Sequence, residues 1–287
     1  MQPLVGGHMK RTVFLLFTLG VAALPALADP PKRPANRNIR YGMPGEAKDD
    51  PASKEAFLID RPQYVLSYND KRKTANWACW QLVSKDIGKT ARGAFEADKG
   101  LPKDFTPISS AQYTGSGFDR GHLVPSKDRS DTEANNDAVF LMTNIVPQSP
   151  NCNQGAWERF ERYCRELADD GKELYIAAGP HGLGGVSSDG AKKLTIGRNA
   201  PFVSVPASVW KVVLVLDKGT NPTKSTRVIA VWMPNDDTVT EDWTTYRVSV
   251  AEVEKKTKLK FFPLVADDVA DAIKEKPDAV KIHTPKK

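Results

Sequence analysis

The sequence predicts an α+β fold with a mainly antiparallel central sheet flanked by helices. Apolar runs that alternate with polar residues or are rich in β-branched residues recur along the chain, as strands do. The stretches with helical periodicity do not alternate regularly with these runs, so a wound parallel sheet is not indicated. The composition, 40% hydrophobic and 26% charged, is close to the average of globular domains. It excludes a mainly disordered, a collagen-like and a multi-span membrane protein.

The first 28 residues have the pattern of a signal peptide. Lys10 and Arg11 precede an apolar run that ends at Leu24, and a small-x-small triplet closes at Ala28. The alternative, an uncleaved anchor, would need roughly 20 apolar residues, whereas this segment offers about 16. We therefore expect export, to a periplasm or out of the cell, and no membrane attachment after cleavage.

The rest of the chain is predicted to have three parts. Residues 29–56, with five prolines up to Pro51, are predicted to form a poorly ordered leader, and residues 277–287 a polar tail. Residues 57–276 are predicted to form the compact domain. The predicted strands are Tyr64–Tyr68, Trp77–Val83, Val139–Thr143, Leu174–Ala178, Val209–Leu216 and Arg227–Met233. The predicted helices are Gln154–Ala168, Val250–Lys256 behind a Ser249/Glu252 capping box, and Ala266–Lys276.

Charge and cysteine content limit the function classes. The whole chain has a formal charge of +6, and without residues 1–28 the balance is +4, which permits a phosphate-rich partner without requiring one. Three cysteines without a C-x-x-C pair, and only four histidines, exclude a zinc-finger array. Cys152 and Cys164 would be too far apart on a helix rising about 1.5 Å per residue to form a disulfide. Any disulfide must therefore include Cys79, and at least one buried free thiol is expected.

The segment from Asp119 to His122 is the first candidate functional motif. An extended conformation would place Arg120 and His122 on one face, because side chains alternate along a strand. The polar loop 125–137 that follows is of the length that tends to be functional in a compact domain. A structural role for both residues remains an alternative. His122 and His181 are the histidines that could act as a base, since His8 lies in or before the signal region and His283 in the tail.

The predicted helix after residue 153 carries the second set of candidates. On a helical wheel, its apolar residues fall within about 40° of Asn153, so this side chain lies along the buried stripe. By itself, an Asn at a helix start is most often an N-cap. Glu161 and Arg165 have the spacing of an ion pair on a solvated face, which is the alternative to a functional role.

These segments together resemble a known family. The strings FDRGHLVPSKDRSD and FLMTNIVPQSPNCNQGAWERFERYCREL are similar to the signature of the DNA/RNA non-specific endonucleases, the ββα-metal or His-Me finger nucleases that include endonuclease G. Weaker resemblance runs from WACWQLVSKDIGKTARG through AAGP and VPASVWKVVL to YRVSVAEVEKKTKLKFFP and ADDV. It covers nearly the whole domain, from about residue 57 to residue 276.

The resemblance implies a role for each candidate residue. His122 would be the general base, Asn153 the direct protein ligand of a magnesium ion, and Glu161 would hold water bound to that ion. The remaining implied roles are phosphate binding by Arg120 and Arg165, transition-state stabilisation by Arg92, and support of the substrate-binding site by Asn144. The implied active site is a ββα-metal finger.

The implied chemistry agrees with the residue types. Neutral imidazole can take a proton from water near pH 7, and arginines are permanently charged donors to phosphate oxygens. A magnesium ion held by a neutral amide keeps most of its positive charge, and Mn²⁺ or another divalent ion could replace it. We expect an exported Mg²⁺-dependent endonuclease that cuts DNA and RNA with little base specificity and leaves 5′-phosphates.

Two other function classes are compatible with the sequence. One is a catalytically silent nucleic-acid-binding module, and the other is a phosphodiesterase restricted to a small substrate. Members of the resembled family often form dimers, but no stretch here identifies an interface. Activity on plasmid, RNA and a dinucleotide would discriminate among these classes.

Overall fold

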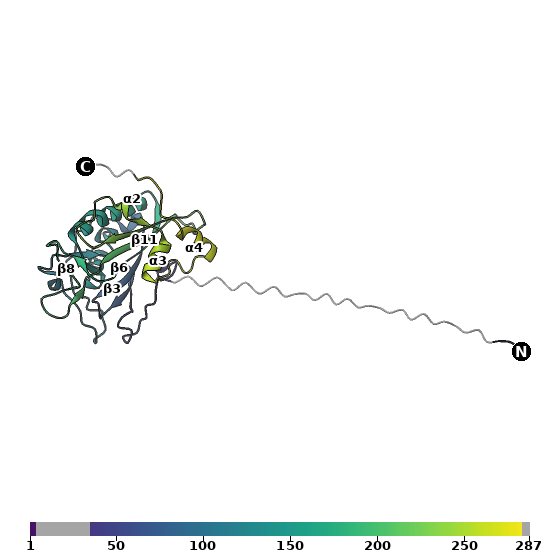
Figure 1. Ribbon diagram of the computed structural model, residues 1–287, viewed down its shortest axis with the longest axis horizontal. Coiled ribbons are helices and arrows are strands. Elements are labelled where there is room, and N and C mark those ends of the chain that lie inside the picture. Colours follow the sequence, from purple (N-terminus) through teal and green to yellow (C-terminus); the bar gives the residue numbers. More distant parts are fainter. Residues whose placement is uncertain (4–34, 283–287) are drawn as a thin grey trace. The chain divides into compact units, whose positions relative to one another are not determined.

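A seven-stranded antiparallel sheet forms the centre of the molecule (Figure 1). The computed structural model describes residues 1–3 and 35–282, so the predicted signal peptide lies almost wholly outside the described residues. The strands, in spatial order, are β1 (Phe57–Asp60), β2 (Val65–Asn69), β3 (Thr74–Leu82), β6 (Lys172–His181), β11 (Ser208–Asp217), β12 (Arg227–Pro234) and β13 (Arg247–Val248). Every neighbouring pair is antiparallel. The predicted α+β class with a mainly antiparallel sheet is confirmed.

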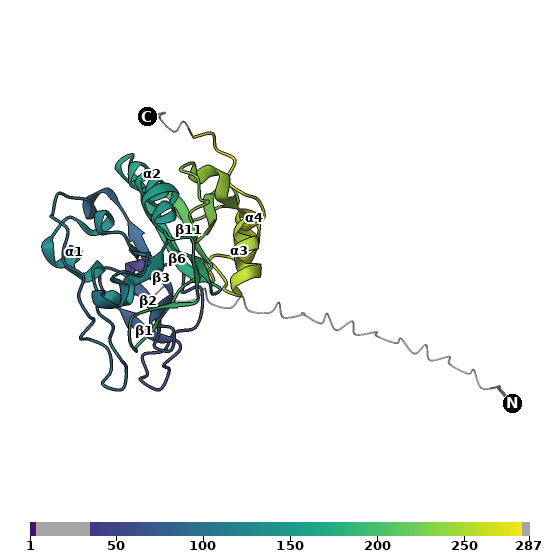
Figure 2. The same cartoon turned by 60° about the vertical axis from the view of Figure 1, so that its left-hand side comes forward.

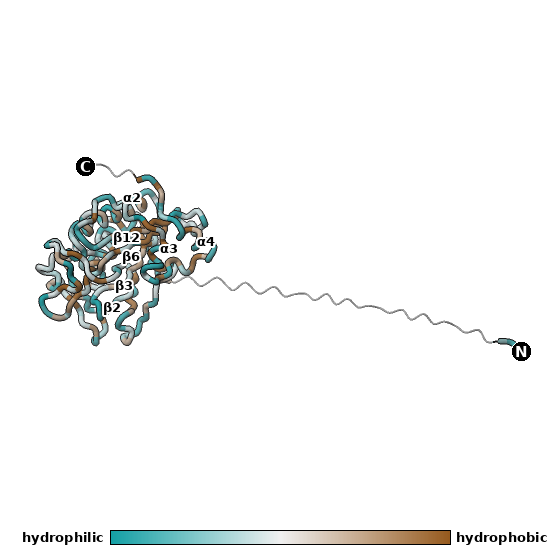
Figure 3. The backbone as a smooth tube through the Cα atoms, viewed as in Figure 1, coloured by the Kyte–Doolittle hydropathy of each residue, from teal (hydrophilic) through white to brown (hydrophobic). Residues whose placement is uncertain are grey.

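Helices cover both faces of the sheet (Figure 2). They are α1 (Glu133–Val139), α2 (Glu158–Asp169), α3 (Val250–Thr257) and α4 (Asp267–Lys274). On one face, Phe160 of α2 belongs to the same buried cluster as Trp80 of β3. On the other face, Val253 of α3 and Ile273 of α4 belong to a second cluster with Trp210. The most hydrophobic parts of the backbone tube gather around these strands (Figure 3).

Short elements complete the fold around the sheet. Three two-stranded ladders pair β4 (Asp119–His122) with β5 (Ile145–Gln148), β7 (Gly185–Val186) with β8 (Lys192–Lys193), and β9 (Thr195–Ile196) with β10 (Val203–Ser204). The 3-10 helices are η1 (Arg37–Ile39), η2 (Ser84–Asp86), η3 (Ser110–Tyr113), η4 (Ser126–Arg129), η5 (Met142–Asn144) and η7 (Trp243–Tyr246). A π-helical turn, η6 (Cys152–Trp157), leads directly into α2.

Most predicted elements lie where the sequence places them, with one clear error. The strand predicted at Val139–Thr143 is wrong: Val139 ends α1, and β5 begins only at Ile145. Thr132 caps α1 by accepting a hydrogen bond from the Asn135 N–H at 3.2 Å. A short apolar run is compatible with either a strand or the buried end of a helix. Here the Thr132 cap starts a helix, and Val139 is its last residue. By contrast, Ser249 caps α3 as predicted.

Residues 35–56 do not form the poorly ordered leader that the sequence predicts. Asn38 is buried, donating to the Pro62 carbonyl at 2.9 Å and accepting from the Gln81 N–H at 3.0 Å. Tyr41 is also buried against the sheet. Polar anchors of this kind leave no periodic signal in the sequence, which is why the proline content alone suggested disorder.

The beginning of the predicted polar tail is also fixed. The side chain of Asp278 is only 3% exposed and forms ion pairs with Arg227 at 2.8 Å and Arg247 at 3.4 Å. Residues 283–287, including the last part of that tail, lie outside the described residues.

Two further findings concern helices and thiols. In the described part of the chain, no helix is long and apolar enough to cross a membrane. The three cysteines are buried and free, in agreement with the expectation of at least one buried free thiol. Burial raises the pKa of the Cys152 and Cys164 thiols to about 12.

Candidate active site

A β-hairpin and the helix after it form the frame of the candidate site. β4 and β5 pair in antiparallel register, with His122 opposite Ile145, and η6 and α2 follow. Gly121 lies between the two candidate residues of β4, and a Cβ there would come within 2.6 Å of Gln148 Cδ. One face of the hairpin is thus closed by Gln148, which is fully buried. Arg120 and His122 share the other face, as the alternation predicts.

A cavity of about 370 Å³ opens beside this hairpin. It is lined by Arg92, Arg120, His122, Pro125, Ser126, Lys127, Asn153, Gln154, Glu158, Glu161 and Arg165. Six of the seven site residues predicted from sequence are therefore brought together, although they come from segments far apart in the chain.

His122 is held between aromatic rings and is only 8% exposed. Its ring lies 4.8 Å from that of Phe140 and 5.3 Å from that of Phe95, measured between centroids. Burial, and secondarily the charge of Arg92, lower the pKa of His122 to about 3. The imidazole is therefore neutral at physiological pH and can accept a proton, and its Nε2 has no hydrogen-bond partner among the described residues.

Asn153 has its amide oriented by a neighbouring carboxylate. Its Nδ2 donates to Asp119 Oδ2 at 2.9 Å, and Gln154 Nε2 donates to the same oxygen at 2.8 Å. The backbone at Gly155 is non-helical, with φ −96° and ψ −110°. Asn153 is not an N-cap, because its side-chain oxygen accepts no hydrogen bond from the described residues. That oxygen is available as a ligand atom.

Glu161 is buried and paired with a lysine from the sheet. Lys211 Nζ lies 3.2 Å from Glu161 Oε1, and the lysine side chain is only 1% exposed. Burial raises the pKa of Glu161, while Lys211 and Arg165 oppose that rise. Glu161 and Arg165 therefore do not form a solvated surface pair with each other. Glu161 pairs with Lys211, and Arg165 pairs with Asp128.

Arg165 lies between a buried and a more exposed carboxylate. Its guanidinium is 3.2 Å from Asp128 Oδ1 and 3.5 Å from Glu158 Oε1. Asp128 also accepts a hydrogen bond from Trp80 Nε1 at 3.0 Å. Burial lowers the pKa of Arg165, but the carboxylates around it more than compensate and raise that pKa overall. The guanidinium is therefore fixed and charged at the cavity wall.

The other two arginines reach the cavity from strand β4 and from the loop after η2. Arg120 donates to the Ser110 carbonyl at 2.8 Å and lies over the rings of Phe95 and Tyr113. Arg92 is exposed, with its guanidinium 5.3 Å from the centre of the Phe140 ring. Neither forms an ion pair with a described residue, so both charges are available to an anion in the cavity.

Asn144 and His181 lie outside the cavity. Asn144 is fully buried, where its amide accepts from the Val124 N–H and donates to the carbonyls of Val124 and Val139. It does not line the cavity but braces the chain after β4 from within the core, where it can support the site only indirectly. The His181 ring meets that of Trp232 edge to face, 4.9 Å between centroids, and lines a different pocket, so His122 is the histidine of this site.

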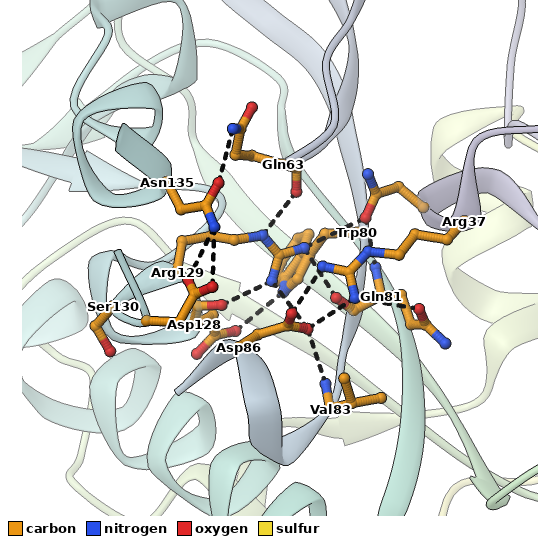
Figure 4. Close-up of polar contacts among 12 residues, drawn as sticks. Arg37, Gln63, Trp80, Gln81, Val83, Asp86, Asp128, Arg129, Ser130 and Asn135 are labelled. Carbon is orange, nitrogen blue, oxygen red and sulfur yellow. Dashed lines mark hydrogen bonds and ion pairs between the residues drawn. The ribbon is translucent and has the colours of Figure 1, made fainter. Parts of the chain in front are cut away.

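A second layer of polar contacts holds η4, which sequence reasoning did not single out (Figure 4). Arg129 is 1% exposed and donates to the carbonyls of Gln63 and Gln81 at 2.8 Å each. Arg37 donates to both carboxylate oxygens of Asp86, at 2.8 and 3.1 Å. This network ties the wall of the cavity to the sheet and to η1. Arg37 and Arg129 are flanked by polar residues in the sequence, so no local pattern marks them as part of this network.

Comparison with known proteins identifies the family. Residues 43–268 match the family model described as DNA/RNA non-specific endonuclease. The chain belongs to this family.

Individual relatives agree with that assignment. A nuclease of Nostoc sp. is 41% identical over 278 residues, which is 91% of this chain and 97% of the relative. Bovine mitochondrial endonuclease G is 29% identical over 255 residues, which is 85% of this chain and 80% of the relative. A solved structure of an EndoG/EndoGI complex matches the fold with a TM-score of 0.64 at 24% identity, covering 80% of this chain and 91% of that one. The protein is thus a nuclease of the non-specific endonuclease family with an EndoG-like fold.

Members of the non-specific endonuclease family are typically metal-dependent, and the residues here fit a hard cation. The free side-chain oxygen of Asn153 and the carboxylate of Glu161 line the same cavity. Oxygen ligands of this kind suit Mg²⁺. Within the described residues, no group of three or more His, Cys, Asp or Glu could form a metal cage. An ion held here would therefore depend on few protein atoms.

Proposed function

We propose that this family member is an exported, Mg²⁺-dependent endonuclease that hydrolyses both DNA and RNA and leaves 5′-phosphate ends. One observation carries the proposal. A neutral, buried imidazole and an amide oxygen without a hydrogen-bond partner line the same cavity as three arginines. A base, a metal ligand and anion-binding groups are what phosphodiester hydrolysis requires.

His122 acts as the general base in this proposal. It takes a proton from the water whose oxygen attacks phosphorus, and the bond from phosphorus to the 3′ oxygen breaks. The 3′ oxygen leaves with a proton from solvent, and the phosphate remains on the 5′ side. A bound phosphate is negatively charged and favours the imidazolium, so substrate raises the low pKa of the free imidazole toward a useful range.

Asn153 would be the direct ligand of the magnesium ion in this proposal, and Glu161 would hold water bound to that ion. Asp119 fixes the Asn153 amide so that its oxygen, and not its nitrogen, is the available atom. The ion, when bound, supplies positive charge to the phosphate and to the departing oxygen. A neutral amide ligand leaves that charge almost undiminished, while Glu161 contributes a carboxylate to the same wall.

In this proposal the arginines bind the phosphates of the substrate backbone. Arg120 and Arg165 are anchored by hydrogen bonds and ion pairs, so they present guanidinium groups without further loss of side-chain entropy. Arg92 is exposed and reaches the same cavity from the loop after η2. Contacts of this kind address phosphates and not bases, which supports activity on DNA and RNA alike.

Export is supported by the sequence pattern of residues 1–28. Two basic residues, an apolar segment too short to span a membrane, and a small-x-small triplet follow one another there. Cleavage would release the domain to a periplasm or to the medium. Expression of the full chain with N-terminal sequencing of the exported product tests this part, and a cytosolic product with an intact N-terminus would contradict it.

The activity is tested with purified mature protein on circular plasmid and on total RNA, with magnesium and with EDTA. We expect both substrates to be cut only with magnesium, and His122→Ala to lower the rate by about 10²–10⁴-fold, as loss of a general base does. His181→Ala removes the other described histidine, which lies outside the cavity, and should cut like wild type. Wild type that binds both nucleic acids but never cuts them would favour a silent binding module. Full activity of His122→Ala would overturn the mechanism.

A further inference from the structure

Lys211 is a buried cation that the proposed mechanism does not use. It lies in the middle of β11, in a run of apolar residues, and its side chain is only 1% exposed. Burying an ammonium group is unfavourable unless it is paired, so its presence in a central strand requires a partner. That partner is Glu161, whose Oε1 lies 3.2 Å from the lysine Nζ.

The surroundings of Lys211 fix its ammonium in one place. It lies 4.1 Å from the centre of the Trp157 ring and 5.5 Å from that of Trp80. Both rings are fully buried, and a desolvated cation over an indole face is strongly favoured. The rings thus hold the ammonium next to Glu161, and Lys211 itself does not line the cavity that Glu161 lines.

We propose that Lys211 is a positioning residue that holds the Glu161 carboxylate in place at the cavity wall. The ion pair one helical turn further along α2 has the same arrangement, because Arg165 lines the cavity and its partner Asp128 does not. Each charge at the cavity wall is thus balanced by one buried charge of opposite sign: Glu161 by Lys211, and Arg165 by Asp128. The inference rests on the proposed role of Glu161 toward magnesium.

The experiment compares Lys211→Met, Lys211→Arg and wild type. Methionine keeps the length and the packing against the two indoles but lacks the charge, whereas arginine keeps the charge. Two readouts are measured: magnesium binding to the full-length mature protein by calorimetry without substrate, and kcat on plasmid. We expect Lys211→Met to lower magnesium affinity and kcat by about 10–100-fold, as loss of an outer-shell partner does. Lys211→Arg should recover most of that loss.

Lys274→Met is the matched control. Lys274 is also a buried lysine paired with a glutamate, Glu254, at 2.9 Å, but it joins α4 to α3 and does not line the cavity. Its loss should lower thermal stability while leaving magnesium affinity and kcat unchanged. If Lys211→Met and Lys274→Met both lose activity in proportion to their loss of thermal stability, the positioning role is overturned.

A double variant separates action through Glu161 from a structural effect. In Glu161→Gln/Lys211→Met neither buried charge remains, so the protein keeps its fold even where the single Lys211→Met does not. If Lys211 acts through Glu161, the double variant should match Glu161→Gln in both readouts. A further loss as large as that of Lys211→Met in the wild-type background would overturn the inference. Failure of the proposed function itself would be seen differently, as wild type that neither binds magnesium nor cuts.

Discussion

The buried imidazole of His122 makes stability depend on pH in a defined window. In the unfolded chain this histidine protonates near pH 6.5, whereas in the folded protein its pKa is about 3. Between these values the unfolded state binds one more proton than the native state. The free energy of unfolding contributed by this group is therefore fully present above pH 6.5 and falls by about 1.4 kcal/mol per pH unit on acidification. By pH 4 the loss is on the order of 3 kcal/mol.

The assay is urea unfolding of wild type and His122→Gln at about pH 7, 6, 5 and 4. The glutamine variant lacks the titrating ring but retains the other ionisable groups, so the difference between the two profiles isolates His122. We expect wild type to lose stability relative to the variant steadily as the pH falls. His181→Gln, which removes the half-buried ring outside the cavity, is the control.

Parallel profiles for wild type and His122→Gln would refute this reasoning. The same shift can be followed directly, because the ring protons of His122 should show no titration near pH 6.5 in NMR spectra of the free protein. A midpoint close to that of an unfolded histidine would mean that the ring is solvated in solution. The packing against Phe95 and Phe140 would then not isolate it from water.

Three further substitutions test the frame of the site. Gly121→Ala would bring a methyl group within 2.6 Å of Gln148 Cδ. We expect kcat to fall about a hundredfold because the site residues on β4 would be displaced. A melting curve of the same variant separates this displacement from unfolding. Wild-type kcat would show that the hairpin tolerates the shift. Asp128→Asn removes the buried countercharge of Arg165 and should lower the free energy of unfolding by about 3 kcal/mol in urea titrations; no change would mean that the pair is not formed in solution. Glu158→Gln removes the more exposed carboxylate near Arg165. We expect it to lower KM about threefold at low salt and less at high salt, because salt screens this charge. A raised KM would instead assign Glu158 to substrate or metal binding.

Periodicity was sufficient to predict the face on which two of the main site residues lie. Alternation along β4 places Arg120 and His122 together, and the structure confirms that both line the cavity. The strand prediction succeeds because the direction of a side chain is fixed by local backbone geometry. The wheel for the following helix assumes a regular α-helix from Asn153, whereas the structure has a π-helical turn with a non-helical Gly155 there, so the wheel does not account for the place of Asn153 at the cavity. The same reasoning failed at Val139, where a helix end and a strand have the same apolar character.

The environment of Glu161 and Arg165 could not be predicted in this way. Their positions on the wheel lie off the apolar stripe, which favours a solvated ion pair. In the structure, Lys211 of β11 pairs with Glu161, 50 residues away in the sequence. Asp128 of η4 pairs with Arg165, 37 residues away. Contacts at such separation depend on the register of the whole sheet, which no local pattern contains. A lysine inside an apolar strand was nevertheless a visible signal, since unpaired burial of that charge is unfavourable.

The same arrangement explains how a nearly charge-balanced protein can attract a polyanion. The cavity wall carries four basic side chains, those of Arg92, Arg120, Lys127 and Arg165, against the carboxylates of Glu158 and Glu161. Since Lys211 and Asp128 balance each other behind that wall, they do not alter its excess of positive charge. Attraction is therefore local to the cavity and does not require a strongly basic surface. A phosphodiester would thus be drawn to the place where the proposed base, His122, and the proposed metal ligand, Asn153, lie.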